Sequence, residues 1–334
     1  MSIFNFRLQT LNLQQRLKQF WRINAPLTFV GVFTFGLLLL MLPGLVVDKR
    51  VITGAPAWLK PCKFAFSTSV YSFTFVWLLG LLQQHRRLAS LAANATAFAL
   101  VVQIIVIIIQ VVRGTTSHFN FSTPQDEALW RFMEIALIFL WTATLVTVIL
   151  LLVERLDNPV LAIALPFSLS LAFIGMGLGF FMTLPTPEQN LALVTGQPVL
   201  HIGAHSVGVP DGGPGIPILY LSTQGGDIRL PHLLGIHAVQ ALPLLSWLIT
   251  SALSHLGRRT QVALMWTASF AYALLMSLFT WQALRAQPIT SPDGLTLAAL
   301  AGLVAVTLIA ILVILAAERY QSLKTQSLAD VNSP

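Results

Sequence analysis

The sequence predicts an all-α integral membrane protein with about eight transmembrane helices. Of its 334 residues, 56% are hydrophobic and only 9% are charged, whereas a soluble domain carries about 25% charged residues. The apolar residues form runs of about 20, the length that a helix needs to cross the hydrocarbon core of a bilayer. These runs show no alternation of apolar and polar residues, so helices are favoured over the strands of a membrane barrel.

Residues 1–24 are predicted to form an amphipathic helix that lies on the cytoplasmic face of the membrane. Apolar side chains recur there at helical spacing among several basic ones, which is typical of interfacial helices. Residues 321–334, at the other end of the chain, are predicted to form a polar cytoplasmic tail.

Between these ends, residues 25–320 are predicted to form the transmembrane domain. Apolar composition predicts eight spans in it: Leu27–Val47, Phe64–Leu82, Leu91–Val112, Phe132–Val153, Val160–Leu184, Leu233–Leu253, Val262–Leu284 and Leu295–Ala317. An even number of spans places both termini on one side. The short connections 83–90 and 255–261 are basic and contain no acidic residue, so the positive-inside rule predicts that both termini are cytoplasmic.

The connections on the opposite, extracytoplasmic side are longer and chemically richer. They comprise residues 48–63, 113–131 and 185–232. The last is too long for a simple connector between helices five and six, and loops of that length are usually functional or disordered. Because it is rich in Gly, Pro and His and poor in charge, it is predicted to be an ordered lid over the bundle.

Five of the seven histidines fall on this predicted outer side, and they are candidate ligands for a zinc or iron ion or a haem: His118, His201, His205, His232 and His237. If the segment around His201 and His205 is helical, their i,i+4 spacing puts both rings on one face. His237 lies one turn inside its span, where polar groups are costly and usually functional. The alternative for each histidine is ordinary hydrogen bonding within the fold.

Polar residues of spans three and four point toward the same end. Gln110 and Arg113 share a helical face with Gln103, and Glu134 follows in the next span. Glu134 or Asp211 is the candidate acid or base, with a local ion pair to Arg131 as the alternative for Glu134. The predicted substrate-binding set is Lys63, Gln110, Arg113, Asp227, Arg229 and Gln240.

Several members of this set have a simpler interpretation. Lys63, Arg113 and Arg229 could hold an anionic group of the substrate. Alternatively, Lys60 and Lys63 are interfacial anchors, and Asp227 pairs with Arg229. The Gly- and Pro-rich segment around Asp211, residues 208–217, is either an anion-binding loop or a structural turn.

Three segments carry a resemblance to other proteins. They are residues 113–120 (Arg-Gly-Thr-Thr-Ser-His-Phe-Asn), residues 203–215 (Gly-Ala-His-Ser-Val-Gly-Val-Pro-Asp-Gly-Gly-Pro-Gly) and residues 226–232 (Gly-Asp-Ile-Arg-Leu-Pro-His). These segments resemble those of a group of bacterial polytopic membrane proteins without an assigned activity. The resemblance implies a bacterial source, and hence the cytoplasmic (inner) membrane, but no substrate.

The sequence therefore predicts a membrane-embedded, metal- or haem-binding enzyme. Its histidine-rich site would open to the extracytoplasmic side and act on a lipid or a small amphiphilic or anionic substrate. The alternatives are a proton-coupled transporter that uses the same polar cavity, and a non-catalytic assembly protein. The predicted partner is the lipid bilayer. Nucleic acid is not expected, because no dense Lys/Arg run with interleaved aromatics is present, and the oligomeric state stays open.

Overall fold

A computed structural model describes residues 12–331, and this part of the chain contains eight helices long and apolar enough to cross a membrane. The first is interrupted, because α2 (Ala25–Met41) is followed after a two-residue break by the short α3 (Gly44–Val47). The others are α4 (Leu59–Leu81), α5 (Arg86–Val112), α6 (Pro124–Val153), α7 (Pro159–Phe181), α9 (Arg229–Ala252), α10 (Arg258–Leu284) and α11 (Gly294–Val331). The predicted all-α, multi-pass architecture is confirmed.

Helix α6 begins well before its apolar run because a polar residue caps it. The side chain of Thr123 accepts a hydrogen bond from the backbone N–H of Asp126, so α6 starts well before the predicted Phe132. Asn158 caps α7 in the same way. At the other end of the chain, α11 continues without a break to Val331, so the predicted tail begins as helix.

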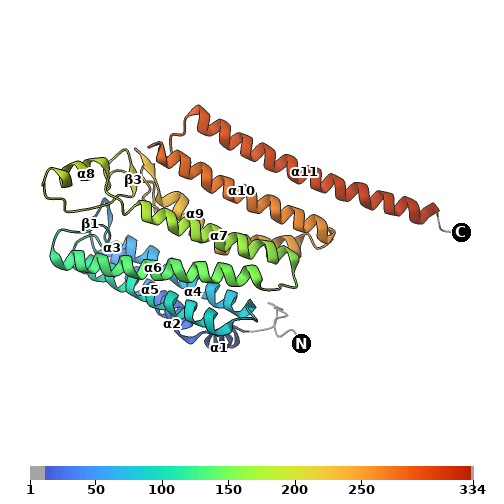
Figure 1. The fold of residues 1–334 in the computed structure, drawn as a ribbon, viewed down its shortest axis with the longest axis horizontal. Helices are drawn as coiled ribbons and strands as arrows, with labels where there is room; N and C mark the ends of the chain where they lie inside the picture. Colours follow the sequence, from blue (N-terminus) through green and yellow to red (C-terminus); the bar gives the residue numbers. More distant parts are fainter. Residues whose placement is uncertain (1–11, 332–334) are drawn as a thin grey trace.

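The described part of the segment predicted as an interfacial helix, residues 12–24, contains helix α1. Helix α1 spans Leu13–Ile23 and begins with a capping box between Asn12 and Gln15. Residues 1–11 of the predicted helix lie outside the described residues. Helix α1 packs against α2 and α4, and it lies at the same end of the bundle as the end of α11 (Figure 1).

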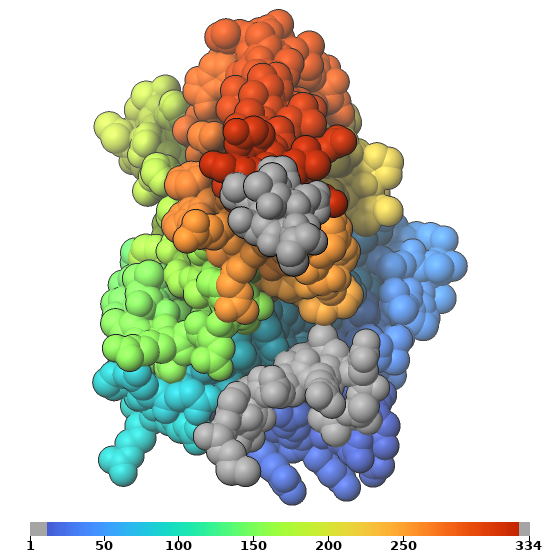
Figure 2. Space-filling view, turned by 90° about the vertical axis from the view of Figure 1, so that its right-hand side faces the viewer, coloured from blue at the N-terminus to red at the C-terminus, as the bar shows by residue number. Residues whose placement is uncertain are grey.

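The spans form two packed groups that share α7. Buried apolar residues of α2, α4, α5, α6 and α7 make the larger core, with Phe75 and Met133 fully enclosed. A second core joins α7 to α9 and α10. Helix α11 packs on α10, and its most apolar stretch buries no residue within the protein. Seen from the end where the chain starts, the first helices and the last two occupy opposite sides of the molecule (Figure 2).

The tightest helix contact is the one between α7 and α9. A Cβ atom on Gly175 would lie 2.6 Å from the Cα atom of Gly235, so the two backbones touch and only glycine fits. This close approach brings His232, near the start of α9, against the carbonyl of Gly175.

The end of the bundle opposite α1, here termed the loop end, consists of residues 48–58, 113–123, 182–228 and 285–293. The longest of these segments replaces the predicted 185–232, because α9 already begins at Arg229, and it contains helix α8 (Pro187–Val194). Strands β3 (Ser206–Val207) and β4 (Gly226–Asp227) pair in antiparallel fashion within it. It also pairs with residues 119–121 through the backbone of residues 200–202.

A small hairpin supports the same segment from the side. Strands β1 (Val51–Ile52) and β2 (Ala55–Pro56) are joined by a turn in which Gly54 has a φ of +75°. A Cβ atom on Gly54 would lie 2.8 Å from the carbonyl carbon of Gly212, so this turn contacts the loop that carries Asp211. The hairpin therefore holds Asp211 in place over the bundle.

Candidate functional site

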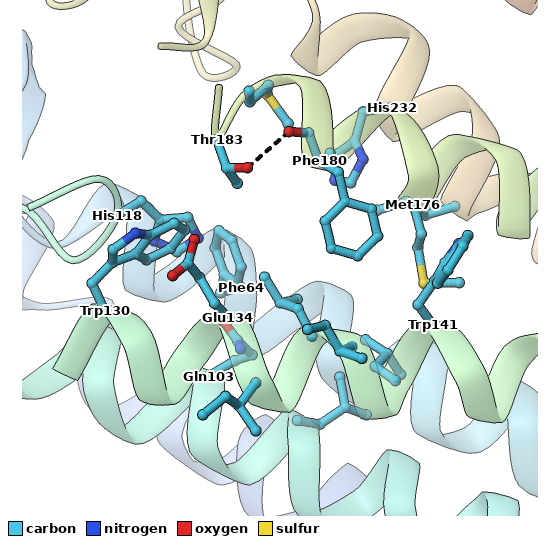
Figure 3. Close-up of a pocket in the computed structure, with 18 of the residues that line it drawn as sticks. Phe64, Gln103, His118, Trp130, Glu134, Trp141, Met176, Phe180, Thr183 and His232 are labelled. Atoms are coloured by element: carbon cyan, nitrogen blue, oxygen red, sulfur yellow. Dashed lines mark hydrogen bonds between the residues drawn. The ribbon is translucent and has the colours of Figure 1, made fainter. Parts of the chain in front are cut away.

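A cavity of about 450 Å³ lies under the loop end, between α4, α5, α6, α7 and α9 (Figure 3). Most of its wall is apolar, formed by Phe64, Leu100, Phe119, Trp130, Ile135, Leu137, Ile138, Leu140, Trp141, Met176, Phe180, Met182 and Ile236. Its polar wall is formed by Ser67, Thr68, Tyr71, Gln103, His118, Arg131, Glu134, Thr183, His205 and His232. Three histidines and an acidic residue therefore share one chamber with a long apolar floor.

The cavity reaches the outer surface of the bundle between α6 and α7. Ile135 and Ile138 of α6 line it although they are 53% and 52% exposed. Across the opening, Trp141 contacts Phe180 of α7 with ring centroids 5.4 Å apart. The exposed α6 side chains Ile135 and Ile138 beside this opening are apolar.

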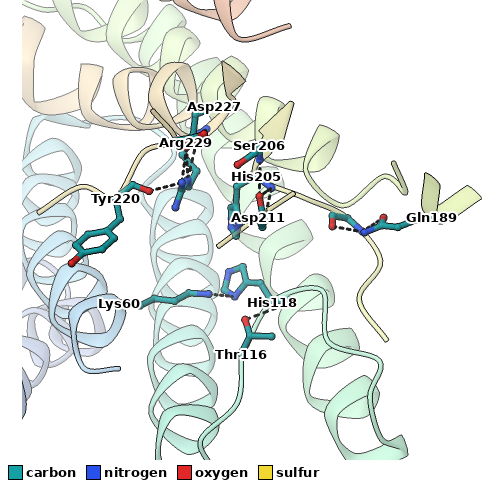
Figure 4. Close-up of polar contacts among 12 residues, drawn as sticks. Lys60, Thr116, His118, Gln189, His205, Ser206, Asp211, Tyr220, Asp227 and Arg229 are labelled. Atoms are coloured by element: carbon teal, nitrogen blue, oxygen red, sulfur yellow. Dashed lines mark hydrogen bonds and ion pairs between the residues drawn. The ribbon is translucent and has the colours of Figure 1, made fainter. Parts of the chain in front are cut away.

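His205 is held by Asp211. The carboxylate of Asp211 accepts a hydrogen bond from His205 Nδ1 at 2.7 Å, and it also accepts from the backbone N–H groups of His205 and Ser206, the latter at 2.8 Å (Figure 4). Three donors thus converge on one carboxylate. Because a carboxylate only accepts, Nδ1 of His205 carries the proton and Nε2 keeps its lone pair.

His232 is fixed in the same tautomer by a different partner. Its Nδ1 donates to the backbone carbonyl of Gly175 at 2.8 Å, and a carbonyl has no proton to give. Its ring also lies against Gly179, where an added Cβ would be 3.2 Å from the ring. His232 therefore presents a second unprotonated Nε2 at the cavity wall.

His118 has the opposite arrangement. Its Nδ1 lies 3.2 Å from Nζ of Lys60 and 3.0 Å from the hydroxyl of Ser117. An ammonium can only donate, so Nδ1 accepts from Lys60 and the proton of the neutral ring is on Nε2. The ring is packed between Phe64 and Trp130 at centroid distances of 5.9 and 5.2 Å.

The charges of these groups act on one another. Burial, together with the positive charge of Lys60, holds the pKa of His118 well below its ordinary value of 6.5. Burial also lowers the pKa of His205, although the hydrogen bond to Asp211 acts in the other direction. Burial would raise the pKa of Asp211, but the hydrogen bonds from His205 outweigh it and hold that pKa below its usual value. At neutral pH the site therefore contains neutral imidazoles and a charged carboxylate.

Glu134 and Gln103 occupy the wall below the histidines. Glu134 accepts from Arg131 at 3.0 Å, so the local ion pair expected as the alternative is present. Figure 3 shows its carboxylate beside His118 and Trp130. Gln103 donates to the carbonyl of Met133, and no donor among the described residues reaches its buried Oε1.

Two of the predicted substrate-binding residues are engaged elsewhere. Gln110 and Arg113 bind the buried carboxylate of Asp126, at 2.8 and 2.6 Å, and neither lines the cavity. The shared helical face was correctly expected, but its outer part meets the start of α6 rather than a chamber. Their role is to join α5 to α6.

Asp227 and Arg229 form the ion pair that was the simpler alternative. Nε of Arg229 donates to Asp227 at 2.9 Å, and its terminal nitrogen donates to the carbonyl of Tyr220 at 2.7 Å. Asp227 in turn accepts from the backbone N–H of Ser222. Lys63 donates to the carbonyl of Leu219 at 3.0 Å. These contacts hold residues 219–229 against α4.

Two predicted histidine ligands and one predicted amide lie outside the cavity. The segment around His201 is extended, not helical, so His201 and His205 do not share a helical face. His201 is exposed and pairs through its backbone with Asn120. His237 contacts Gln240 at 3.3 Å, and neither lines the cavity.

The structure lends no support to the predicted metal site. Within residues 12–331, no group of three His, Cys, Asp or Glu side chains is arranged to hold a metal ion. A catalytic zinc needs three protein ligands, whereas His205 and His232 are the two cavity histidines whose Nδ1 donates to the protein and whose Nε2 keeps its lone pair.

Sequence reasoning underrated Lys60 and overlooked the aromatic walls. The interpretation of Lys60 as an interfacial anchor misses its contact with the site, because its Nζ reaches Nδ1 of His118. A weak signal was present, since a membrane-interface lysine on the same helical face as Ser67 has a polar route inward. Trp130 and Trp141 gave no signal, because aromatic residues are ordinary in apolar spans.

Comparisons of the chain with protein-family models, with curated proteins and with solved structures find no match. Function is therefore inferred from the geometry of the cavity and of the groups around it.

The lowered pKa values of His118 and His205 predict a loss of stability at mildly acidic pH. The unfolded chain binds protons near pH 6.5, whereas the folded chain resists them, so the free energy of unfolding is full above pH 6.5 and falls as the pH drops below it. The melting temperature in detergent should fall between pH 8 and pH 5. A His118→Gln variant should lose less over this range, with His205 as one source of the drop that remains.

The matched control is His255→Gln, because His255 is exposed at the other end of the bundle. It should keep the full drop. Asp211 does not confuse the measurement, since a lowered carboxyl pKa affects stability only below about pH 4. An equal slope in wild type and His118→Gln would show that His118 is not buried as a neutral ring.

Proposed function

We propose that the protein is a membrane enzyme that performs acid–base chemistry on an amphiphile bound in the cavity. The observation that carries this proposal is the His205–Asp211 pair at the head of the cavity, meaning its polar end under the loop end. The rest of the cavity is apolar and opens sideways to lipid. The acyl chain or other apolar part of the substrate occupies the aromatic floor. Its headgroup lies under the loop end.

His205 is the candidate general base. In hydrolytic triads a carboxylate holds the Nδ1–H of a histidine, and the other nitrogen takes the proton of the attacking group. Asp211 is placed for the first role and Nε2 of His205 for the second. The attacking group is a water or a hydroxyl of the substrate: its oxygen bonds to the ester carbon or phosphorus of the amphiphile, the ester C–O or P–O bond breaks, and the leaving oxygen takes the proton that His205 removed. The neighbouring Lys60 and His118 supply positive potential and a donor.

The side opening supports a membrane-derived substrate. A water-soluble ligand would need a polar route from the surface, whereas the gap between α6 and α7 is bordered by Ile135, Ile138 and Phe180. Glu134 and Arg131 lie beside this route as an ion pair. Their polar groups suit a headgroup that moves past them, so Glu134 is assigned to access rather than to proton transfer.

Proton-coupled transport has one observation in its favour. Helices α7 and α9, which pack closely, each contain an internal proline, Pro166 and Pro243, and interrupted helices are common in carriers. A carrier also needs a path to the other side. The cavity ends near Leu100 and Leu140, and beyond it the bundle is filled by fully buried side chains such as Leu165. Enzyme chemistry at one face fits this shape better.

The loop end is assigned to the extracytoplasmic side of a bacterial cytoplasmic membrane, with both termini cytoplasmic. The basic connections 82–85 and 253–257, with their flanking arginines, are at the other end of the bundle and support this orientation by the positive-inside rule. The active site then faces the periplasm.

Cysteine labelling tests this orientation. Cys62 is the single cysteine and is buried, so it can be replaced by alanine without losing a labelled site. In that background, Val194→Cys on the 86% exposed position of α8 should react in intact cells with a membrane-impermeant maleimide. Ser254→Cys, exposed at the other end, should react only after the cells are broken. The reverse pattern would refute the assignment.

Catalysis is tested by untargeted lipid mass spectrometry on the purified protein in nanodiscs of bacterial lipid extract. Wild type should convert at least one lipid species over time. His205→Asn and Asp211→Asn should slow this conversion by about 100-fold or more, the usual contribution of a general base. The exposed-site control His255→Asn should match wild type. An unchanged lipid profile with wild type, or equal conversion by His205→Asn, would contradict the proposal.

A further inference from the structure

Two lysines at the start of α4, Lys60 and Lys63, have no carboxylate partner among the described residues, and Lys63 donates to the backbone carbonyl of Leu219 while Lys60 reaches His118. Nζ of Lys60 contacts Nδ1 of His118 and forms no ion pair within residues 12–331. By contrast, Arg229 is paired with Asp227 and Arg113 with Asp126. An ammonium taken out of water without a countercharge is unfavourable, and one hydrogen bond to a neutral ring does not replace the lost hydration.

The surrounding charges leave the head of the cavity short of one negative charge. The cations Lys60, Lys63 and Arg229 act on one another there. Two carboxylates face them, and both are already saturated. Asp211 accepts from His205 and two backbone N–H groups, and Asp227 accepts from Arg229 and Ser222. Three cations against two carboxylates leave a net positive charge of one.

The donors at this point fit an oxyanion. Lys60 has three ammonium protons, of which one is used by His118. Within residues 12–331, the proton on Nε2 of His118 has no hydrogen-bond partner either. His118 lines the polar end of a chamber whose remaining length is apolar, and Lys60 contacts the His118 ring from the start of α4 (Figure 4). A phosphate or carboxylate joined to an acyl chain satisfies the charge and the shape together.

We infer that the amphiphile of the proposed function carries an oxyanion, phosphate or carboxylate, and that Lys60 with His118 forms its binding site. This inference rests on the proposed function for the location of the apolar chain. It replaces the sequence-based expectation that Lys63, Arg113 and Arg229 hold the anion. Arg113 belongs to a separate network, and Arg229 and Lys63 hold the loop and add long-range potential.

The test is native mass spectrometry of the full chain in a neutral maltoside detergent, with three probes that share an oleoyl chain. The probes are oleoyl lysophosphatidate, oleate and uncharged monoolein, and inorganic phosphate is a fourth. Wild type should retain lysophosphatidate or oleate at least 10-fold more tightly than monoolein. Inorganic phosphate should bind far more weakly than either, because it lacks the chain.

Substitutions of Lys60 identify the site. Lys60→Met should weaken retention of the anionic probes at least 10-fold and leave monoolein within twofold. Lys60→Arg should restore most of the anion affinity. Removing a buried charge should not prevent folding, so a melting temperature at or above that of wild type verifies Lys60→Met. The control is Lys49→Met, because Lys49 is exposed at the same end and bonds only to the carbonyl of Val46.

The outcomes separate this inference from the proposed function. Equal retention of monoolein and the anionic probes, or anion binding that survives Lys60→Met, overturns the oxyanion site and leaves the amphiphile cavity standing. Failure to retain any oleoyl probe overturns the proposed function itself. Tight binding of inorganic phosphate comparable with lysophosphatidate would indicate a free anion as the ligand and also overturn the inference.

Discussion

The hydrogen bonds that converge on Asp211 organise the loop end of this protein. One carboxylate binds the imidazole of His205 and two backbone N–H groups, and hydrogen bonds to a charged group contribute roughly 1.5–3 kcal/mol each. They close residues 205–211 into a tight turn, which the β1–β2 hairpin supports through Gly54 and Gly212. The same bonds set the tautomer of His205. Loop closure and the tautomer of His205 therefore have one cause.

The cavity below follows from how the spans pack. Touching glycines on α7 and α9 draw these helices together and fix His232, while α6 and α7 meet mainly through Trp141 and its aromatic neighbours. The looser contact leaves a chamber whose lining includes exposed apolar side chains of α6. One end of this chamber holds buried neutral imidazoles and the rest of its wall is apolar, which suits a molecule with a polar headgroup and an apolar chain.

Hydropathy alone could predict the spans, because the hydrocarbon core demands long apolar helices whatever their neighbours. It could not predict where a helix begins, which depends on caps such as Thr123. Helical spacing predicted that Gln110 and Arg113 share a face, but not that both bind the carboxylate of Asp126 on that side. Pairing His201 with His205 failed because strand pairing with residue 120 keeps that segment extended. Contacts between segments that are distant in the sequence decide both the partner of Gln110 and Arg113 and the conformation around His201. Local residue spacing does not predict such contacts.

The central claim is that one chamber, roofed by the His205–Asp211 pair, holds an amphiphile that enters between α6 and α7. Cryo-electron microscopy of the protein in nanodiscs of bacterial lipid tests it most directly. The expected map has elongated density along the aromatic floor, with its head beside Lys60 and His118. A map in which side chains fill the chamber, or in which α6 and α7 close it from the bilayer while lipid density stays outside, would contradict the claim.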